Sequence, residues 1–478
     1  MQEMDYRQLR NRYPVFVVRS PRWRLTTTEL DIQFDFEIPG LADFAPRLLF
    51  PLSPGNQAAS LPAAWIERLV RDLALIEMIS YWKCCCPPTV RIEGWRPGPE
   101  EADWWYQVYR NGLGEFFYRN GIAPDEPPLR FEALTGAGAG PLPAAPATLR
   151  FDAVLVPVGG GKDSVVALER LSPGPRRRVA FALNATGAAL GTMEQAGIAP
   201  DDRVLVRRRL DPALLELNSR GFLNGHTPFS ALLAFVAELA ALLHGCGFVA
   251  LSNEASASDA TVAGSDVNHQ WSKSFAFETL FRRYEERAYP WPVQYFSLLR
   301  PFSELAIARE FCRHPRYHDV FLSCNLGGRA NRWCGACGKC LFVALMLLPF
   351  LGPERIQTLI APDILERKEL EEAFDGLVGL RDTKPWECVG TVTEVNFALG
   401  LAVKNQGWLE PGARPPALVR RWLEARRAGC LPSVPVGTKH PFRLQTTEDH
   451  IPAEFRPAIA DLLADGAAAF PDSEPVSR

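Results

Sequence analysis

The sequence has few of the features that commit a chain to nucleic acid or to a membrane. Its 478 residues carry 52 Lys and Arg against 55 Asp and Glu, a formal net charge of −3. A chain so close to neutral gains little from long-range attraction to nucleic acid. The longest apolar stretch, 341–351, is too short to span a bilayer, and the first residues contain no apolar signal core. We therefore expect a cytoplasmic protein with no nucleic-acid partner and no membrane insertion.

Lysine is scarce as well, since it accounts for eight of the basic residues and arginine for the rest. Arginine suits carboxylate and phosphate groups, although a genome rich in G and C produces the same bias. Cysteine is not scarce, because the chain has 11. This odd number, with no signal segment, argues against a disulfide framework and for reduced thiols.

The pattern along the chain predicts an α/β protein with four parts. These are an N-terminal α+β domain (1–134), a Gly/Ala/Pro linker (135–150), an α/β domain (151–355) and a helical C-terminal region with a polar tail (356–478). In the third part, strand-like runs at 151–158, 178–184, 203–207, 248–252, 293–299 and 320–324 alternate with helical runs. Such alternation favours a doubly wound, mostly parallel sheet.

The most informative segment is 158–164, VGGGKDS, which lies between a strand-like run and a helical run. Three glycines permit close backbone approach and positive φ, so that several N–H groups can face one anion. The helix start that follows adds a partial positive charge. The segment is neither a Walker A loop nor a Gly-x-Gly-x-x-Gly fingerprint. We predict that a phosphate or pyrophosphate binds at Gly159, Gly160, Gly161, Lys162, Asp163 and Ser164.

This segment resembles the pyrophosphate loop of the ATP pyrophosphatases, whose usual form is Ser-Gly-Gly-x-Asp-Ser. Gly159 occupies the position of the opening serine, so one hydroxyl is lost. The resemblance implies the ATP pyrophosphatase type of sheet, with ATP and Mg²⁺ as cofactors. It also implies that a carboxylate or carbonyl oxygen is adenylylated, with release of pyrophosphate and then of AMP.

A second motif is a cluster of thiols at Cys324, Cys334, Cys337 and Cys340. Two adjacent C-x2-C spacings let one turn present successive sulfurs to one ion, and tetrahedral Zn²⁺ needs four ligands. The spacing resembles that of the deazaguanine nitrile synthases, which implies a structural zinc. An iron–sulfur cluster and unmetallated buried thiols are the alternatives.

Several other segments are similar to the UDP-N-acetylmuramoyl-L-alanyl-L-glutamate epimerases. They are 111–121 (NGLGEFFYRNG), 225–230 (GHTPFS), 252–258 (SNEASAS), 268–274 (NHQWSKS), 332–340 (RWCGACGKC) and 387–391 (ECVGT). The resemblance spans most of the chain. It implies a substrate, a UDP-linked muramoyl dipeptide of peptidoglycan synthesis whose terminal L-Glu is inverted to D-Glu. A functional link to an L-glutamate-adding ligase follows.

Inversion requires a base on one face of the α-carbon and a proton donor on the other. The candidate catalytic residues are Lys162, Asp163, His226, Glu254, Lys273 and Cys388, and His269 and the Glu387 beside Cys388 are further candidates for the proton transfer. Cys388 can act as a thiolate base or pack as a small apolar residue. His226 can equally cap a helix or bind phosphate, and Glu254 can bind Mg²⁺ or ribose. The sequence leaves the identity of the base open.

Three other functions compete with epimerisation. One is a small-molecule adenylylating ligase or nitrile synthase, suggested by the cysteine spacing. Another is an RNA-thiolating enzyme, which the net charge disfavours. The third is a nucleotide-binding regulatory protein without catalysis, which the intact Lys162, Asp163 and Ser164 oppose.

Overall fold

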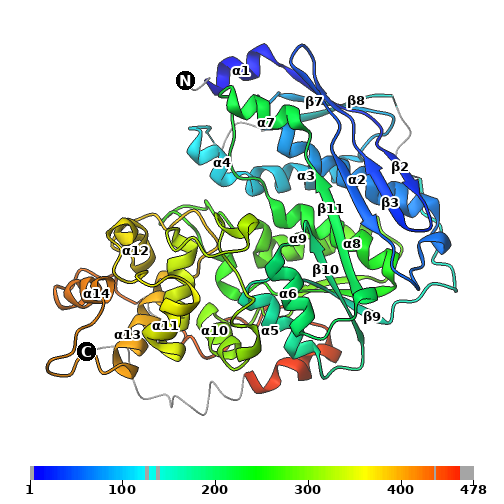
Figure 1. Ribbon diagram of the computed structural model, residues 1–478. Coiled ribbons are helices and arrows are strands. Elements are labelled where there is room, and N and C mark those ends of the chain that lie inside the picture. Colours follow the sequence, from blue (N-terminus) through cyan, green and yellow to red (C-terminus); the bar gives the residue numbers. More distant parts are fainter. Residues whose placement is uncertain (1–4, 124–128, 136–139, 435–437, 463–478) are drawn as a thin grey trace.

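The computed structural model describes residues 5–123, 129–135, 140–434 and 438–462, and the structural statements below concern these residues. Two β-sheets organise them (Figure 1). The smaller sheet has the order β5 (Ala42–Phe44), β4 (Phe36–Ile38), β1 (Val15–Val18), β7 (Thr89–Glu93) and β8 (Arg130–Thr135). The larger has the order β13 (Gln294–Ser297), β12 (Cys246–Leu251), β9 (Ala153–Pro157), β10 (Arg177–Leu183), β11 (Arg203–Arg209), β6 (Arg47–Pro51), β3 (Glu29–Gln33) and β2 (Arg22–Leu25).

The first five strands of the larger sheet, β13 to β11, are parallel, as the alternating pattern predicted. The N-terminal strands β6, β3 and β2 extend this sheet in antiparallel fashion, starting from the β11–β6 pair. The sheet therefore crosses the expected boundary between the first and third parts of the chain. Residues 136–139 of the expected linker lie outside the described residues.

Side chains of the central strand β9 alternate between two hydrophobic cores, as a strand covered on both faces requires. Ala153 and Leu155 belong to the core shared with the N-terminal strands, whereas Val154 and Val156 belong to a second core. The helices of the first core are α2 (Ala63–Trp82), α3 (Pro99–Gly112), α8 (Phe229–His244) and α9 (Phe275–Ala288). Those of the second core are α5 (Lys162–Leu171), α6 (Gly187–Gln195), α10 (Glu304–Cys312) and α11 (Gly338–Leu359).

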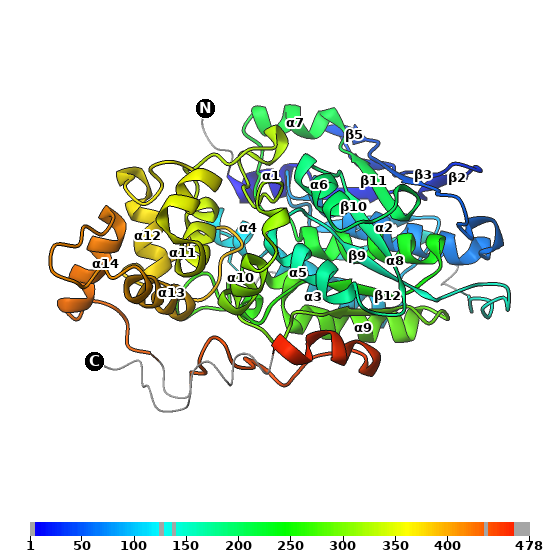
Figure 2. The same ribbon diagram turned by 60° about the horizontal axis from the view of Figure 1, so that its bottom comes forward.

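The C-terminal region is helical, as expected, and packs around α11. Its helices are α12 (Glu371–Val378), α13 (Val392–Asn405) and α14 (Ala417–Arg427), which form the yellow and orange group in Figures 1 and 2. The remaining helices are α1 (Tyr6–Arg12), α4 (Gly114–Arg119) and α7 (Pro212–Ser219). A short 3-10 helix, 453–459, returns to the larger sheet, where the Phe455 ring lies 5.0 Å from that of Phe248. The mixed α/β fold with parallel strands is thus confirmed, and its ATP pyrophosphatase type stays a prediction.

One expected strand is wrong. Residues 320–324 form an irregular segment in which the N–H of Leu322 donates to the carbonyl of Gly160 at 2.8 Å. This apolar run packs against the glycine-rich segment. The Leu322 N–H, which a sheet would need as a donor, is bonded to that segment instead.

Helix α11 is long and apolar enough to cross a membrane by length and composition alone. Most of its side chains are buried inside the molecule, and its regular geometry is interrupted at Gly352, where φ is +74°. A buried core helix passes the same test, so this helix is weak evidence for a membrane span.

Candidate active site

The glycine-rich segment 158–164, called here the nucleotide loop, connects β9 to α5 at the carboxyl end of the parallel strands. In doubly wound sheets this edge is where ligands bind. Gly160 has a φ of +87°, and a Cβ there would lie 2.6 Å from the backbone of Ala188 and Ala189. A Cβ at Gly161 would lie 2.6 Å from the Ser323 hydroxyl oxygen. Gly160 therefore requires glycine, whereas the Ser323 hydroxyl could turn away from a side chain at position 161. The positive φ predicted from the sequence is present at Gly160, and the approach of an anion to this backbone stays a prediction.

Gly159 differs from the two glycines that follow it. A Cβ at this position meets no atom within 4 Å, and its φ is not in the left-handed region. The backbone would therefore accept the serine that opens the usual form of the motif.

Lys162 of the nucleotide loop has a side chain that is 1% exposed. It pairs with the carboxylates of Asp163 and Glu304. Burial opposes a charge on this lysine, but the two carboxylates raise its pKa above the ordinary value. The Glu304 N–H in turn donates to Glu394 at 2.8 Å. Lys162 is thus engaged inside the protein, and sequence reasoning missed its partner Glu304.

Three carboxylates gather beside the nucleotide loop, from Asp163, Glu254 and Glu304. Glu254 follows β12 and is buried. Burial, together with the negative charge of Asp163, raises the pKa of Glu254, and the same causes raise the pKa of Glu304 to about 7. Asp163 itself has a lowered pKa, because Lys162 outweighs the effect of burial. Oxygen ligands of this kind suit Mg²⁺.

Cys388 lies in the segment between α12 and α13, and its Sγ accepts a hydrogen bond from Nζ of Lys273 at 3.1 Å. The Lys339 ammonium donates to the carbonyl of Cys388. Burial alone would raise the pKa of Cys388, but the charge of Lys273 and a hydrogen bond with His269 lower it to about 6. This thiol is therefore a thiolate at neutral pH, unlike an ordinary cysteine.

The predicted residue His226 meets His269 and Glu115. Nδ1 of His269 lies 2.5 Å from the Glu115 carboxylate, Nδ1 of His226 lies 3.5 Å from it, and the two rings are 4.5 Å apart. Burial opposes charge on both rings. Hydrogen bonds with Cys388 and Glu115 nevertheless raise the pKa of His269 to about 9, whereas burial and the His269 charge lower that of His226 to about 4. His269 is therefore charged and His226 neutral at neutral pH.

We call Glu115, His226, His269, Lys273 and Cys388 the thiolate cluster. Two histidines and a carboxylate could also hold a metal ion, since their ligand atoms lie within 4.8 Å of one another. However, the Glu115–His269 hydrogen bond already occupies two of those atoms. Sequence reasoning did not single out Glu115. Its signal is a lone carboxylate among the apolar residues Leu113, Phe116 and Phe117.

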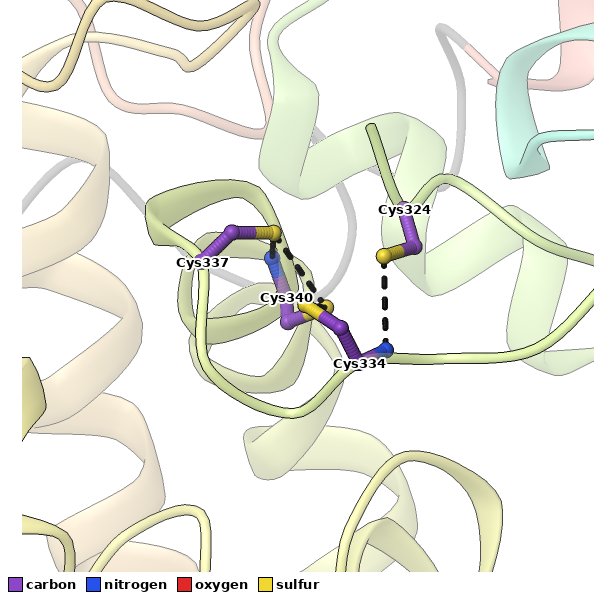
Figure 3. A group of neighbouring side chains, drawn as sticks. All are labelled: Cys324, Cys334, Cys337 and Cys340. Carbon is purple, nitrogen blue, oxygen red and sulfur yellow. Dashed lines mark hydrogen bonds between the residues drawn. The ribbon is translucent and has the colours of Figure 1, made fainter. Parts of the chain in front are cut away.

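The four cysteines of the second motif converge as the spacing predicted (Figure 3). Their sulfur atoms all lie within 4.8 Å of one another, with Cys337 and Cys340 3.4 Å apart. Backbone N–H groups point at the sulfurs, including those of Gly327 at 3.0 Å and Cys334 at 3.3 Å from Sγ of Cys324. Such bonds stabilise thiolates, so the donor set fits Zn²⁺.

This cysteine site supports both other parts of the active site. Cys324 follows directly after Leu322 and Ser323, which contact the nucleotide loop. Lys339, which holds the Cys388 carbonyl, lies between Cys337 and Cys340 at the start of α11. Sequence reasoning did not assign this role to Lys339.

Several basic residues next to the motifs have acidic partners inside the protein. Arg208 binds the buried Glu77 at 2.8 Å, Lys384 binds Asp259 at 2.5 Å, and Arg381 binds Glu372 at 2.6 Å. These groups are therefore partly compensated before any substrate binds.

A cavity of about 650 Å³ lies away from these groups. Val154, Leu171 and Phe455 line it, at the amino end of β9 and the carboxyl end of α5. None of the predicted site residues lines this cavity, so it lies outside the candidate active site.

Comparison with known proteins assigns the family. The chain matches two family models, described as the MurL N-terminal domain over residues 7–298 and the MurL C-terminal domain over residues 320–425. A protein from Xanthomonas oryzae pv. oryzae named UDP-N-acetyl-alpha-D-muramoyl-L-alanyl-L-glutamate epimerase is 38% identical, over 79% of this chain and 81% of the relative. Proteins of the same name from Salinispora tropica and a Micromonospora strain are 36% and 35% identical, each over 85% of this chain and over 88% and 90% of the relative.

This chain belongs to the UDP-N-acetyl-alpha-D-muramoyl-L-alanyl-L-glutamate epimerase family. It is an enzyme of the isomerase class, as the sequence motifs indicated. No solved structure matches the chain.

The candidate active site draws on both matched family domains. The nucleotide loop, Glu115, both histidines and Lys273 fall within the N-terminal match. Cys388 and the four clustered cysteines fall within the C-terminal match. The Lys273–Cys388 contact joins the two domains at the site itself.

Proposed function

We propose that this epimerase inverts the terminal L-glutamate of UDP-N-acetylmuramoyl-L-alanyl-L-glutamate, using ATP to activate the α-carboxylate. The names of its relatives support the substrate and the inversion. The observation that carries the ATP dependence is the nucleotide loop, which lies beside a thiolate and shares Lys273 with it. Phosphate binding and proton transfer would then occur at neighbouring positions.

The chemistry explains why an epimerase needs such a loop. Removing the α-proton of a free carboxylate would place a second negative charge on an anionic group. In the proposed reaction the carboxylate oxygen attacks the α-phosphorus of ATP, and the bond to the β-phosphate breaks to release pyrophosphate. The acyl-adenylate then loses its α-proton to form an enolate, which is protonated on the opposite face by an acid that exchanges with solvent. Hydrolysis gives the D-glutamate product and AMP.

The residues present fit ATP and Mg²⁺. Backbone N–H groups of the nucleotide loop and the start of α5 would face the phosphates. Asp163 and Glu254 offer carboxylate oxygens that would hold Mg²⁺, whereas Glu304 is engaged with Lys162, and the ion would neutralise charge on the phosphates. Lys273 carries its positive charge close to the Asp163 and Glu254 carboxylates.

We also propose a structural zinc ion held by Cys324, Cys334, Cys337 and Cys340. A closed set of four thiolates leaves no open position, so this ion would have a structural role and take no part in the chemistry. It would fix the segment behind Gly160 and the lysine that holds the Cys388 carbonyl.

The remaining expectations concern the setting of the enzyme. The reaction would take place in the cytoplasm as a step of peptidoglycan precursor synthesis, and a ligase that adds L-glutamate would supply the substrate. The names of the relatives favour epimerisation over nitrile synthesis, ligation or RNA thiolation.

One experiment tests the proposed function. The protein is incubated in D₂O with ATP, Mg²⁺ and the L-glutamate-terminated precursor, and AMP, α-deuterium and D-glutamate are measured. We expect all three to appear together and to require ATP. D-glutamate formed without AMP would refute the adenylylation, and the absence of D-glutamate would refute the epimerisation. The L-alanyl precursor without glutamate is the control, for which we expect no AMP.

A further inference from the structure

Cys388 is unlike two other cysteines of this chain, the buried Cys246 and the partly buried Cys312. Burial raises the pKa of both Cys246 and Cys312 to about 12, because no nearby cation outweighs the loss of solvent. At Cys388 an ammonium lies 3.1 Å from the sulfur and an imidazolium is hydrogen-bonded to it. A thiol that only packs would need neither group, and holding two buried cations beside it is costly unless the sulfur is an anion.

The other side chains of the thiolate cluster follow one another outward from the Cys388 sulfur. Lys273 and His269 contact Cys388 directly. Glu115 binds His269 on its other side, and His226 lies beyond Glu115. Glu115 therefore keeps the His269 ring charged and oriented, as a carboxylate does for a catalytic imidazole. His226, the fourth of these groups, contacts Glu115 and the His269 ring.

Cys388 lies close enough to the nucleotide loop to act as a base on the α-carbon of an adenylylated substrate. In an acyl-adenylate the α-carbon is separated from the α-phosphorus by the ester oxygen and the acyl carbon. A base for its proton must therefore lie a few ångströms from the site of the α-phosphate. The Lys273 ammonium, which contacts the Cys388 sulfur, also interacts with Asp163 of the loop and with Glu254. One lysine side chain thus separates the thiolate from the phosphate site.

We propose that Cys388 is the base that removes the α-proton of the adenylylated glutamate, and that Lys273 and His269 are positioning residues that keep its sulfur ionised. In this step the Cα–H bond breaks, an S–H bond forms, and the electron pair of the carbon moves into the enolate. No oxidant or reductant takes part. This inference rests on the proposed function, because an unactivated carboxylate would not yield its α-proton to a thiolate.

The hydrogen bond from Lys339 to the Cys388 carbonyl fixes the backbone and leaves the sulfur free to act. The positive charges of Lys273, His269 and Lys339 all lower the pKa of the Cys388 thiol. The same arrangement explains why Lys273 could not be the base, since its pKa is raised.

The deciding experiment compares Cys388→Ala and Cys388→Ser with wild type, using the precursor, ATP and Mg²⁺ in D₂O. We expect D-glutamate formation and α-deuterium uptake to fall by about 10³-fold, the scale of a lost general base. AMP release should continue, because adenylylation precedes the proton transfer and the L-glutamyl adenylate can be hydrolysed without inversion. Cys430→Ser, at an exposed thiol, is the matched control and should keep both activities.

The outcomes separate this proposal from the proposed function. Epimerisation by both Cys388 variants within tenfold of wild type would overturn the assignment of the base and leave the ATP-dependent reaction intact. Parallel loss of AMP release and epimerisation in both variants would overturn it too, because the thiol would then serve the nucleotide loop. An absence of AMP release from the wild-type enzyme would instead refute the proposed function.

A second measurement needs no variant. Wild-type enzyme is treated with iodoacetamide over a range of pH, and labelling at Cys388 is followed by mass spectrometry. We expect half-maximal reactivity at a pH of about 6, and loss of epimerisation in proportion to labelling while AMP release persists. Half-maximal reactivity near pH 9 or above, or full epimerisation by the labelled enzyme, would overturn the proposal.

Discussion

The nucleotide loop and the thiolate cluster lie next to each other but are assembled in opposite ways. The loop is one stretch of seven residues, of which 158–161 follow β9 and 162–164 begin α5. The thiolate cluster collects its side chains from α4, from the segments before α8 and α9, and from the segment after α12. Binding an anion through backbone N–H groups needs one turn. Stabilising a buried thiolate needs several cations that only the folded chain brings together.

The charge balance also differs between the nucleotide loop and the thiolate cluster. Around the nucleotide loop, Lys162 is matched by the carboxylates of Asp163 and Glu304. In the thiolate cluster, Lys273 and His269 together stabilise one sulfur, and Glu115 offsets part of their charge. Because separate groups govern the two steps, substitutions should separate AMP release from epimerisation.

The largest effect on AMP release is expected for Asp163→Asn in the nucleotide loop. This change removes a carboxylate that partners Lys162 and that we assign to Mg²⁺. We expect AMP release to fall by about 10²- to 10³-fold, the scale of one lost electrostatic stabiliser of a transition state. Epimerisation should fall by the same factor, because it follows activation, in contrast to the separation expected for Cys388→Ala.

The rates of AMP release and D-glutamate formation, measured side by side, check this expectation. Asp201→Asn, at an exposed position, is the matched control and should change neither rate. If Asp163→Asn kept AMP release but lost epimerisation, the division of labour between loop and cluster would be wrong.

The same contrast explains what the sequence could predict. The nucleotide loop was identified because its glycines, its buried strand and its helix start are adjacent in the chain. The four cysteines were found because three of them lie within seven residues, 334–340. Glu115 was not singled out, since its two histidine partners lie more than 100 residues away. The segment 320–324 was taken for a strand because an apolar run does not reveal whether its backbone pairs with a sheet or with a loop.

The segments that carry the four clustered cysteines contact both the nucleotide loop and Cys388. Loss of this cysteine site should therefore affect AMP release and epimerisation alike. We expect the wild-type protein to contain about one zinc ion per chain, as a closed four-thiolate site implies. Cys337→Ser should lose this ion and lower AMP release and epimerisation together, by about 10- to 100-fold. The cause is that Leu322 and Lys339, which contact the loop and Cys388, are no longer held.

Metal analysis of the purified proteins, with Cys430→Ser as control, checks the zinc content. A wild-type protein with much less than one zinc ion per chain, unchanged in Cys337→Ser, would refute the metal site. If Cys337→Ser lost zinc and only one of the two activities, the cysteine site would support only one half of the active site.

The smallest expected effect is that of Glu115→Gln, which leaves the loop intact and weakens the cluster from its far side. Wild-type epimerisation should rise as Cys388 ionises, at a pH of about 6. Glu115 raises the pKa of His269, so its replacement by an amide should lower that pKa and leave less positive charge beside the sulfur. The pKa of Cys388 should then rise, and the acid limb of the profile should move to higher pH. The active range therefore narrows from the acid side, with about a tenfold loss near pH 6 for a shift of about one pKa unit.

Rates of D-glutamate formation from pH 5 to 10 check this narrowing, and AMP release in the same samples serves as an internal reference. Glu216→Gln, on the surface of α7, is the matched control and should keep the wild-type profile. A Glu115→Gln profile that falls uniformly at all pH values would mean that Glu115 acts only in packing. A shift of AMP release along with epimerisation would mean that the cluster also controls activation, and the comparison between loop and cluster would no longer hold.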